Sequence, residues 1–304
     1  MLGLLWLVDG LLQLQPPMFR LGPNGLAATL ADNAMVSPVP FYSSIEAGFV
    51  QFVVFYVAIA NWLFAGTQLA LSTLVTMGAL AGSGAGRAAL RIGLVGSVAW
   101  GLGVWVFGEA FGQMIFPQAN MAVAGSPGAG LLYAAIAVLI LRPNLKAALA
   151  VWVALWDGTA LLLLEKGNWA PDGLGAQISA HASGEPHVVA SVDHVVGRAL
   201  AGAGLPVALG MLIVQVLVAH SVLRPLTRRT SLVLGAAVSG AYWAVGQNFG
   251  GVLSGHSTDP SLGPPAILLA WTIWSLSKRA GSGSSAEAPD QAAALLPHAN
   301  STRS

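Results

Sequence analysis

Three acidic residues lie within strongly apolar stretches of the sequence and could do chemistry there: Asp9, Glu109 and Asp157. A carboxylate in the middle of a membrane-spanning helix costs about 2.5–3.5 kcal/mol to insert, so it should face other helices and have a partner or a proton. These side chains are therefore candidates for a proton or cation site. The alternative is a structural contact, for example between Asp9 and Gln13 one helical turn further on.

Glu109 belongs to a motif that occurs twice. The first copy reads Trp-Val-Phe-Gly-Glu-Ala-Phe-Gly-Gln over 105–113, and the second reads Trp-Ala-Val-Gly-Gln-Asn-Phe-Gly-Gly over 243–251. Gln247 replaces the carboxylate, which favours either one asymmetric site or one active and one degenerate site. Gln113, one turn after Glu109, is a further polar candidate. Small residues at this spacing let two helices approach closely, which predicts a helix-packing role for Gly108, Gly112, Gly246 and Gly250.

Histidines between the apolar stretches are weaker candidates, because histidine suits zinc with carboxylates and copper with methionine. They are His181, His187, His194 and His256, and the acids near them or in similar segments are Glu46, Glu185, Asp193 and Asp259. The histidine spacing matches no compact metal motif, so solvated loop residues are the simpler interpretation. The chain has no cysteine, which excludes disulfides and thiolate sites. The sequence identifies no cofactor.

The composition is typical of a membrane protein. The 304 residues are 55% apolar and only 8% charged, with a mean hydropathy of +0.71, whereas soluble domains carry about 25% charged residues. A lipid bilayer is thus the expected surrounding, and other membrane subunits are candidate partners. A net charge of +1 gives no sign of nucleic acid.

Apolar runs of about 20 residues are long enough to cross the hydrocarbon core. We predict eight spans, at 1–15, 58–81, 91–114, 127–141, 146–165, 199–221, 230–250 and 264–278. The first is short, which suggests that the native protein starts upstream of Met1. Residues 41–57 are predicted to form a helix at the outer interface, and 281–304 a disordered cytoplasmic tail.

The distribution of Lys and Arg predicts a plasma-membrane protein with both termini in the cytoplasm. The predicted inner segments hold Arg87, Arg91, Arg142, Lys146, Arg224, Arg228, Arg229, Lys278, Arg279 and Arg303. The predicted outer segments hold only Arg20, Lys166 and Arg198.

The two halves of the chain resemble each other. A shift of 148 residues places Asp9-Gly10 on Asp157-Gly158, and after a shorter inner loop a shift of 138 places Trp105 on Trp243 and Pro127 on Pro265. Each unit has an even number of spans, so we predict an all-α integral membrane protein built from two parallel four-helix repeats. The first unit covers 1–144 and the second 145–280.

The run Asp9-Gly10-Leu-Leu-Gln13-Leu resembles the first helix of DoxX-like membrane proteins, which carries an aromatic residue or His, then Gly, then Lys-Leu at that spacing. Here Asp stands for the His and Gln for the Lys, and the second copy at Asp157-Gly158 lacks the Gln. The chain also looks like small tandem-repeat membrane proteins of actinobacteria. The resemblance implies a respiratory or redox accessory role.

Three functional hypotheses follow. The first is a non-enzymatic accessory or scaffold protein, or a redox-associated component, of an envelope complex. The second is a small-molecule or ion transporter with Asp9, Asp157 and Glu109 on its path, although the acidic residues cluster on the outer side. The third is a quinone- or metal-linked membrane enzyme with an outer-face site, which requires the histidines to converge on Glu109.

Overall fold

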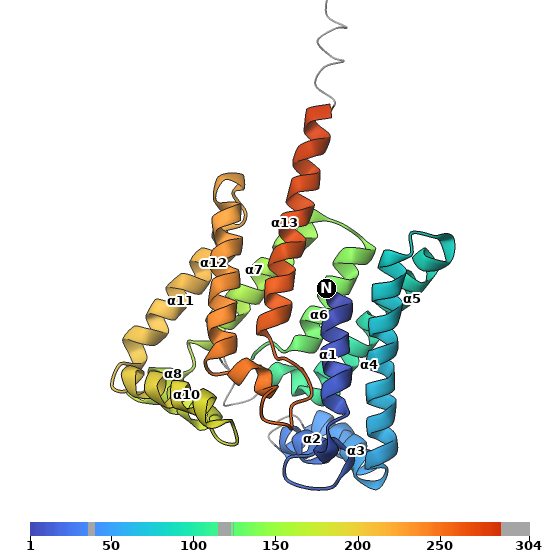
Figure 1. Cartoon of the computed structure of the whole chain (residues 1–304). Helices are drawn as coiled ribbons and strands as arrows, with labels where there is room; N and C mark the ends of the chain where they lie inside the picture. Colours follow the sequence, from blue (N-terminus) through green and yellow to red (C-terminus); the bar gives the residue numbers. More distant parts are fainter. Residues whose placement is uncertain (36–39, 115–122, 124, 287–304) are drawn as a thin grey trace, which may run out of the picture.

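A computed structural model describes residues 1–35, 40–114, 123 and 125–286, and within these ranges the chain is helical without any strand (Figure 1). The predicted all-α class is confirmed. The first half contains α1 (Leu2–Gln13), the 3₁₀ turn η1 (Pro16–Phe19), α2 (Leu26–Met35), α3 (Pro40–Phe55), α4 (Val57–Leu80), α5 (Gly84–Gly103), the π-helical turn η2 (Val104–Gly108), the 3₁₀ turn η3 (Ala110–Gln113) and α6 (Ala129–Leu141).

The second half has a comparable order of helices, but their lengths differ, since α6 has 13 residues and α13 has 24. It contains α7 (Leu145–Leu162), α8 (Lys166–Trp169), α9 (Gly173–His181), α10 (His187–Leu200), α11 (Gly204–Ser221), α12 (Pro225–Ala244), the 3₁₀ turn η5 (Asn248–Gly251) and α13 (Gly263–Ala286). Packing follows the same order in both halves: α1 contacts α4, α4 contacts α5 and α5 contacts α6, while α7 contacts α11, α11 contacts α12 and α12 contacts α13. Helix α13 joins the halves by packing against α6, α7 and α1.

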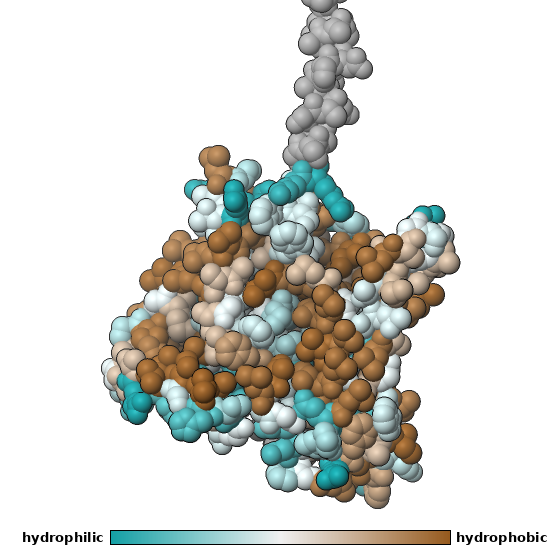
Figure 2. Space-filling model, in the orientation of Figure 1, coloured by the Kyte–Doolittle hydropathy of each residue, from teal (hydrophilic) through white to brown (hydrophobic). Residues whose placement is uncertain are grey.

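Four helical segments in the described ranges are long and apolar enough to cross a membrane: α4, α5 continued by η2, α7 and α11. Helices α1, α3 and α6 are apolar but shorter. Figure 2 shows a broad hydrophobic band around the middle of this face, with hydrophilic residues towards both ends. A membrane protein is therefore supported, and the further predicted spans remain predictions.

The short helices gather at one end of the bundle, where α2, α3, α8 and α10 are visible (Figure 1). The opposite end carries the α4–α5 and α11–α12 turns and the far end of α13. A helix was predicted at 41–57 and is present as α3, whereas α2, α9 and α10 lie in segments expected to be loops. Helix α10 buries Val189, Asp193 and Gly197, and this four-residue spacing defines one helix face.

The C-terminal boundary differs from the prediction, because α13 runs on to Ala286, beyond the expected end of the second unit at 280. The remainder of the predicted tail, 287–304, lies outside the described residues.

The repeated glycine motif is not part of a regular helix, contrary to the spans predicted at 91–114 and 230–250. Regular helix α5 ends at Gly103 and α12 ends at Ala244. Gly112 has a φ of +61° and Gly250 a φ of +73°, and a Cβ atom would lie 2.2 Å from the Pro127 oxygen or 2.3 Å from the Pro260 carbonyl carbon, respectively.

The helix-packing interpretation is therefore wrong for Gly112, Gly246 and Gly250, which all have positive φ. Gly112 and Gly250 occupy left-handed turns in which a backbone approaches closely, a place that suits glycine because it lacks a Cβ. Gly246 also has a positive φ, +83°, and lies against Val123. At Gly108 a Cβ would meet only Val104 of the preceding turn.

The two motifs nevertheless make matching contacts. Trp105 Nε1 donates to the Pro127 oxygen and Trp243 Nε1 to the Pro260 oxygen, each over 2.8 Å. Pro260, and not the predicted Pro265, thus holds the place that Pro127 holds in the first half. The sequence alignment missed this because the loop before α13 differs in length from the loop before α6.

Candidate functional site

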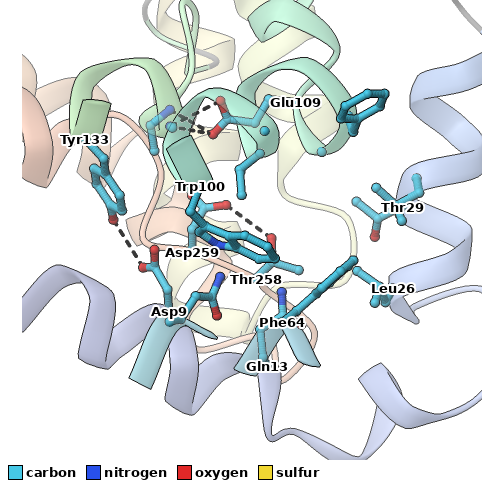
Figure 3. Close-up of a pocket in the computed structure, with 18 of the residues that line it drawn as sticks. Asp9, Gln13, Leu26, Thr29, Phe64, Trp100, Glu109, Tyr133, Thr258 and Asp259 are labelled. Atoms are coloured by element: carbon cyan, nitrogen blue, oxygen red, sulfur yellow. Dashed lines mark hydrogen bonds between the residues drawn. The ribbon is translucent and has the colours of Figure 1, made fainter. Parts of the chain in front are cut away.

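A cavity of about 180 Å³ lies within the first half, between α1, α4, η2, α6 and the loop that precedes α13 (Figure 3). Three carboxyl side chains line it: Asp9, Glu109 and Asp259. Six aromatic side chains also line it: Trp6, Phe49, Phe64, Trp100, Phe107 and Tyr133. Two of the predicted polar candidates, Asp9 and Glu109, are therefore brought to one place.

Asp9 comes from α1 and is only 2% exposed. The hydroxyl of Tyr133 on α6 donates to its Oδ1 over 3.1 Å. Tyr133 is held edge-on against Trp6, with ring centroids 4.6 Å apart, and Trp6 Nε1 donates to Ser97 Oγ over 2.9 Å. This chain of contacts ties Asp9 to α5 and α6 and fixes its side chain at the cavity wall.

Glu109 lies between η2 and η3, and its carboxylate caps the start of α6. Oε1 accepts from the backbone N–H groups of Ala129 at 2.9 Å and Gly130 at 3.1 Å, and Oε2 accepts from Gly130 at 3.2 Å. Free N–H groups and the helix dipole favour a negative charge at a helix N-terminus. Gln247 does the same at α13, where its Oε1 accepts from Gly263 N over 3.2 Å.

Asp259 lies in the loop between η5 and α13 of the second half, yet it lines the cavity of the first half. Its Oδ1 accepts from Ser261 N over 2.7 Å and its Oδ2 from the hydroxyl of Thr258 over 3.1 Å. Burial raises the pKa of the Asp259 carboxyl, while these two hydrogen bonds lower it. Sequence reasoning grouped Asp259 with loop acids, because nothing local indicates which half the loop contacts.

Two amide side chains complete the cavity wall with unused hydrogen-bonding capacity. Gln13 and Gln68 are 3% and 4% exposed and both line the cavity. Within the described residues their Oε1 atoms accept no hydrogen bond, and the Trp100 Nε1 donates none. Such atoms are costly to bury without a hydrogen-bond partner, and all three belong to side chains that line the cavity.

A shallower and more polar depression of about 400 Å³ adjoins the cavity and shares Thr29, Thr258 and Asp259 with it. His181 and His256 line this depression together with Glu185. His187 and His194 do not line it: His187 contacts Ser191 along α10, and His194 is exposed on the same helix. Among the described residues, no group of three or more His, Asp or Glu side chains is placed to hold a metal ion.

Asp157 does not share the surroundings of Asp9, although the two residues align in the sequence. Its Oδ2 lies 3.2 Å from Nε2 of His220 on α11, and the two side chains are 35% and 55% exposed. Gln113 ends the η3 turn with a φ of +58° and is not part of the cavity wall. Neither Asp157 nor Gln113 lines the cavity.

The corresponding region of the second half is nearly filled, with a space of about 10 Å³ beside Thr159, Tyr242 and Gln247. Gln215 is fully buried there. Its Oε1 accepts from Thr159 Oγ1 over 3.0 Å, and its Nε2 donates to the Tyr242 hydroxyl over 3.2 Å. The two halves thus differ: one encloses a cavity with unused polar atoms and the other a satisfied polar network.

These features define an all-helical protein with four candidate membrane-crossing helices and an acidic, aromatic cavity at one end of the bundle. No protein-family model, curated protein or solved structure matches the chain. The resemblance to DoxX-like proteins therefore stays a prediction from Asp9, Gly10 and Gln13.

Proposed function

We propose that this protein is a multi-pass plasma-membrane protein that binds a small, partly apolar molecule in the cavity of its first half. The observation that carries the proposal is the contrast between the two halves. The cavity at Asp9, Glu109 and Asp259 has about 180 Å³ and buried amide atoms without partners, and its counterpart has about 10 Å³.

The architecture we propose is the predicted one, two parallel four-helix repeats with eight spans. The matching order of helices and of helix contacts supports it. So do the matching turns, in which Phe111 and Phe249 both have positive φ and pack against Trp105 and Trp243 at centroid distances of 5.1 and 5.2 Å. Helices α1 and α6 are short for spans, and each packs against a longer helix, α1 against α4 and α6 against α5.

We propose that the cavity faces the extracytoplasmic side, with both termini in the cytoplasm. The basic residues support this orientation: Arg87 and Arg91 lie near the start of α5, Arg224, Arg228 and Arg229 lie at the start of α12, and Lys278 lies towards the end of α13. These segments lie at the end of the bundle opposite to α2, α3 and α10 (Figure 1). Cytoplasmic segments carry the excess of Lys and Arg in membrane proteins.

Binding a small molecule is compatible with two of the hypotheses from the sequence. In a transporter, the path at this end would pass Asp9, Glu109 and Asp259, and not Asp157. In an accessory protein of DoxX-like type, the cavity would hold a redox-active or regulatory molecule for a neighbouring subunit. A metal-linked enzyme has less support, because His187 and His194 lie away from Glu109.

The test compares ligand binding to the purified full chain and to a variant with a filled cavity. Gly103 lines the cavity and its Cβ would meet nothing within 4 Å, so Gly103→Leu should occupy the space without a clash. Gly210→Leu is the matched control, since Gly210 is exposed on α11 and also has open space at its Cβ. The assay is calorimetry in lipid nanodiscs with a panel of small aromatic cations, anions, neutral alcohols and quinones.

We expect at least one class to bind the wild-type protein and Gly210→Leu, and not Gly103→Leu. If no member of the panel distinguishes Gly103→Leu from the control, the proposed binding function is refuted.

A further inference from the structure

From the chemistry of the cavity wall we infer that the molecule bound there is an organic cation, with an ammonium group among the carboxyl side chains and an apolar body against the aromatic rings. This inference rests on the proposed binding function and adds the class of ligand.

The charges around the cavity are of one sign. Asp9, Glu109 and Asp259 are all acidic and line the same cavity, so their ionised forms repel one another. No Lys, Arg or His is among the residues that line the cavity in the described part of the chain. A cation placed between these side chains would offset their mutual repulsion in surroundings that screen charge poorly.

The polar atoms without a hydrogen-bond partner also favour a cationic ligand that donates hydrogen bonds. Oε1 of Gln13 and Oε1 of Gln68 are hydrogen-bond acceptors in side chains more than nine-tenths buried. An ammonium group supplies several N–H donors and would satisfy both these oxygens and a carboxylate. The Trp100 Nε1 is a donor, so a ligand that also carries one hydroxyl or ether oxygen would fit best.

The apolar wall suits the remainder of such a ligand. Phe49 contacts Phe64 and Phe107 at centroid distances of 6.3 and 5.2 Å, and Phe64 contacts Trp100 at 5.5 Å. Aromatic faces attract cations within about 6 Å of the ring centroid and recognise alkylated ammonium groups. Figure 3 shows Phe64 and Trp100 beside the same cavity as Asp9, Gln13 and Thr258.

The second half shows what closes an equivalent space. Gln215 corresponds to Gln68 at a shift of 147, which aligns the starts of α4 and α11, and Tyr242 corresponds to Val104 at the shift of 138 that aligns Trp105 with Trp243. Tyr242 fills its space and accepts a hydrogen bond from Gln215 Nε2, and Thr159 donates to Gln215 Oε1. The smaller Val104 leaves the first cavity open, and Gln68 Oε1 accepts no hydrogen bond there. Val104→Tyr should therefore close the first cavity with the residue type that fills the equivalent space in the second half.

The experiment measures binding of four probes of similar size to the full chain in nanodiscs by calorimetry. The probes are 2-phenylethylamine as cation, 3-phenylpropan-1-ol as neutral compound and phenylacetate as anion, and benzylamine serves as a second cation with N–H donors. Asp259→Asn removes one charge and keeps a loop side chain of the same shape. Val104→Tyr and Gly210→Leu are the closed variant and the matched control.

We expect the cations to bind the wild-type protein and Gly210→Leu, with affinity lowered about 10-fold or more by Asp259→Asn, since a charge-assisted hydrogen bond contributes about 1.5–3 kcal/mol. We expect no binding to Val104→Tyr. The inference is overturned if the neutral compound or the anion binds as tightly as the cations, or if Asp259→Asn leaves cation affinity unchanged, although the binding function then stands. If neither cation binds while another class in the wider panel does, the cation assignment alone fails, and if nothing binds, both proposals fail.

Discussion

Substitution of the motif glycines by alanine tests whether they form a left-handed turn or a helix-packing surface. If these residues formed a helix-packing surface, Gly108→Ala and Gly112→Ala would be similarly damaging. Of these two glycines, only Gly112 has a positive φ, +61°. A Cβ there would lie 2.2 Å from the Pro127 oxygen and 2.3 Å from the Pro127 carbonyl carbon. At Gly108 the Cβ would lie 3.4 Å from Val104 Cγ1, which is ordinary contact.

The expected cost for Gly112→Ala has two parts. A left-handed backbone costs an alanine about 1–2 kcal/mol, and forcing apart atoms that overlap costs about 1–3 kcal/mol more. The sum is about 2–5 kcal/mol, which corresponds to a fall in apparent Tm of about 5–15 °C for a protein of this size. Gly108→Ala should lie within about 2 °C of the wild type, since alanine loses less conformational entropy than glycine.

The assay is thermal unfolding of the purified protein in mild detergent, followed by far-UV circular dichroism at one scan rate. Gly250→Ala provides an internal repeat of the test, because Gly250 has a φ of +73° and a Cβ there would lie 2.3 Å from the Pro260 carbonyl carbon. Equal shifts for Gly108→Ala and Gly112→Ala, or no shift for Gly112→Ala and Gly250→Ala, would refute the turn geometry.

Further predictions concern the site and the topology. Tyr133→Phe removes the only hydrogen bond described for the Asp9 side chain and keeps the aromatic contact with Trp6. We expect the free energy of unfolding to fall by about 1–3 kcal/mol, measured by the same unfolding assay. An unchanged Tm would contradict the buried hydrogen bond. Because the chain has no cysteine, Ser183→Cys should react with a membrane-impermeant maleimide in intact cells and Ala85→Cys only after permeabilisation, and the reverse pattern would invert the proposed orientation. Burial raises the pKa of the Asp259 carboxyl, so the folded chain binds this proton more tightly than the unfolded chain. Stability should therefore fall as the pH rises from about 4. Asp259→Asn should flatten this pH dependence, and an unaltered slope would show that the group does not titrate differently on folding.

The sequence alone determined the kind of protein and much of its arrangement along the chain. The low content of charged residues and the length of the apolar runs follow from the need to satisfy every backbone polar group inside lipid, so they are readable without a structure. The helices α4, α7 and α11 begin or end within a few residues of the predicted spans. The difference between Glu109 and Gln247 was also visible in the repeated motif.

Local pattern could not show how the motif folds. Glycines four residues apart fit both a helix surface and a left-handed turn. The choice was decided by Pro127 and Pro260, which pack against Gly112 and Gly250 from the loops before α6 and α13. The same applies to the amphipathic helices α2, α9 and α10, whose apolar faces are short and were lost among the longer apolar runs.

The membership of the site was decided only by the tertiary structure. Asp9 and Asp157 occupy matching positions in the sequence, yet Asp9 is buried against Tyr133 and Asp157 is paired with the half-exposed His220. Asp259 joins Asp9 and Glu109 because a loop of the second half reaches the cavity of the first. Such contacts depend on how the two halves pack, and packing between residues about 150 or more positions apart leaves no periodicity or spacing in one sequence.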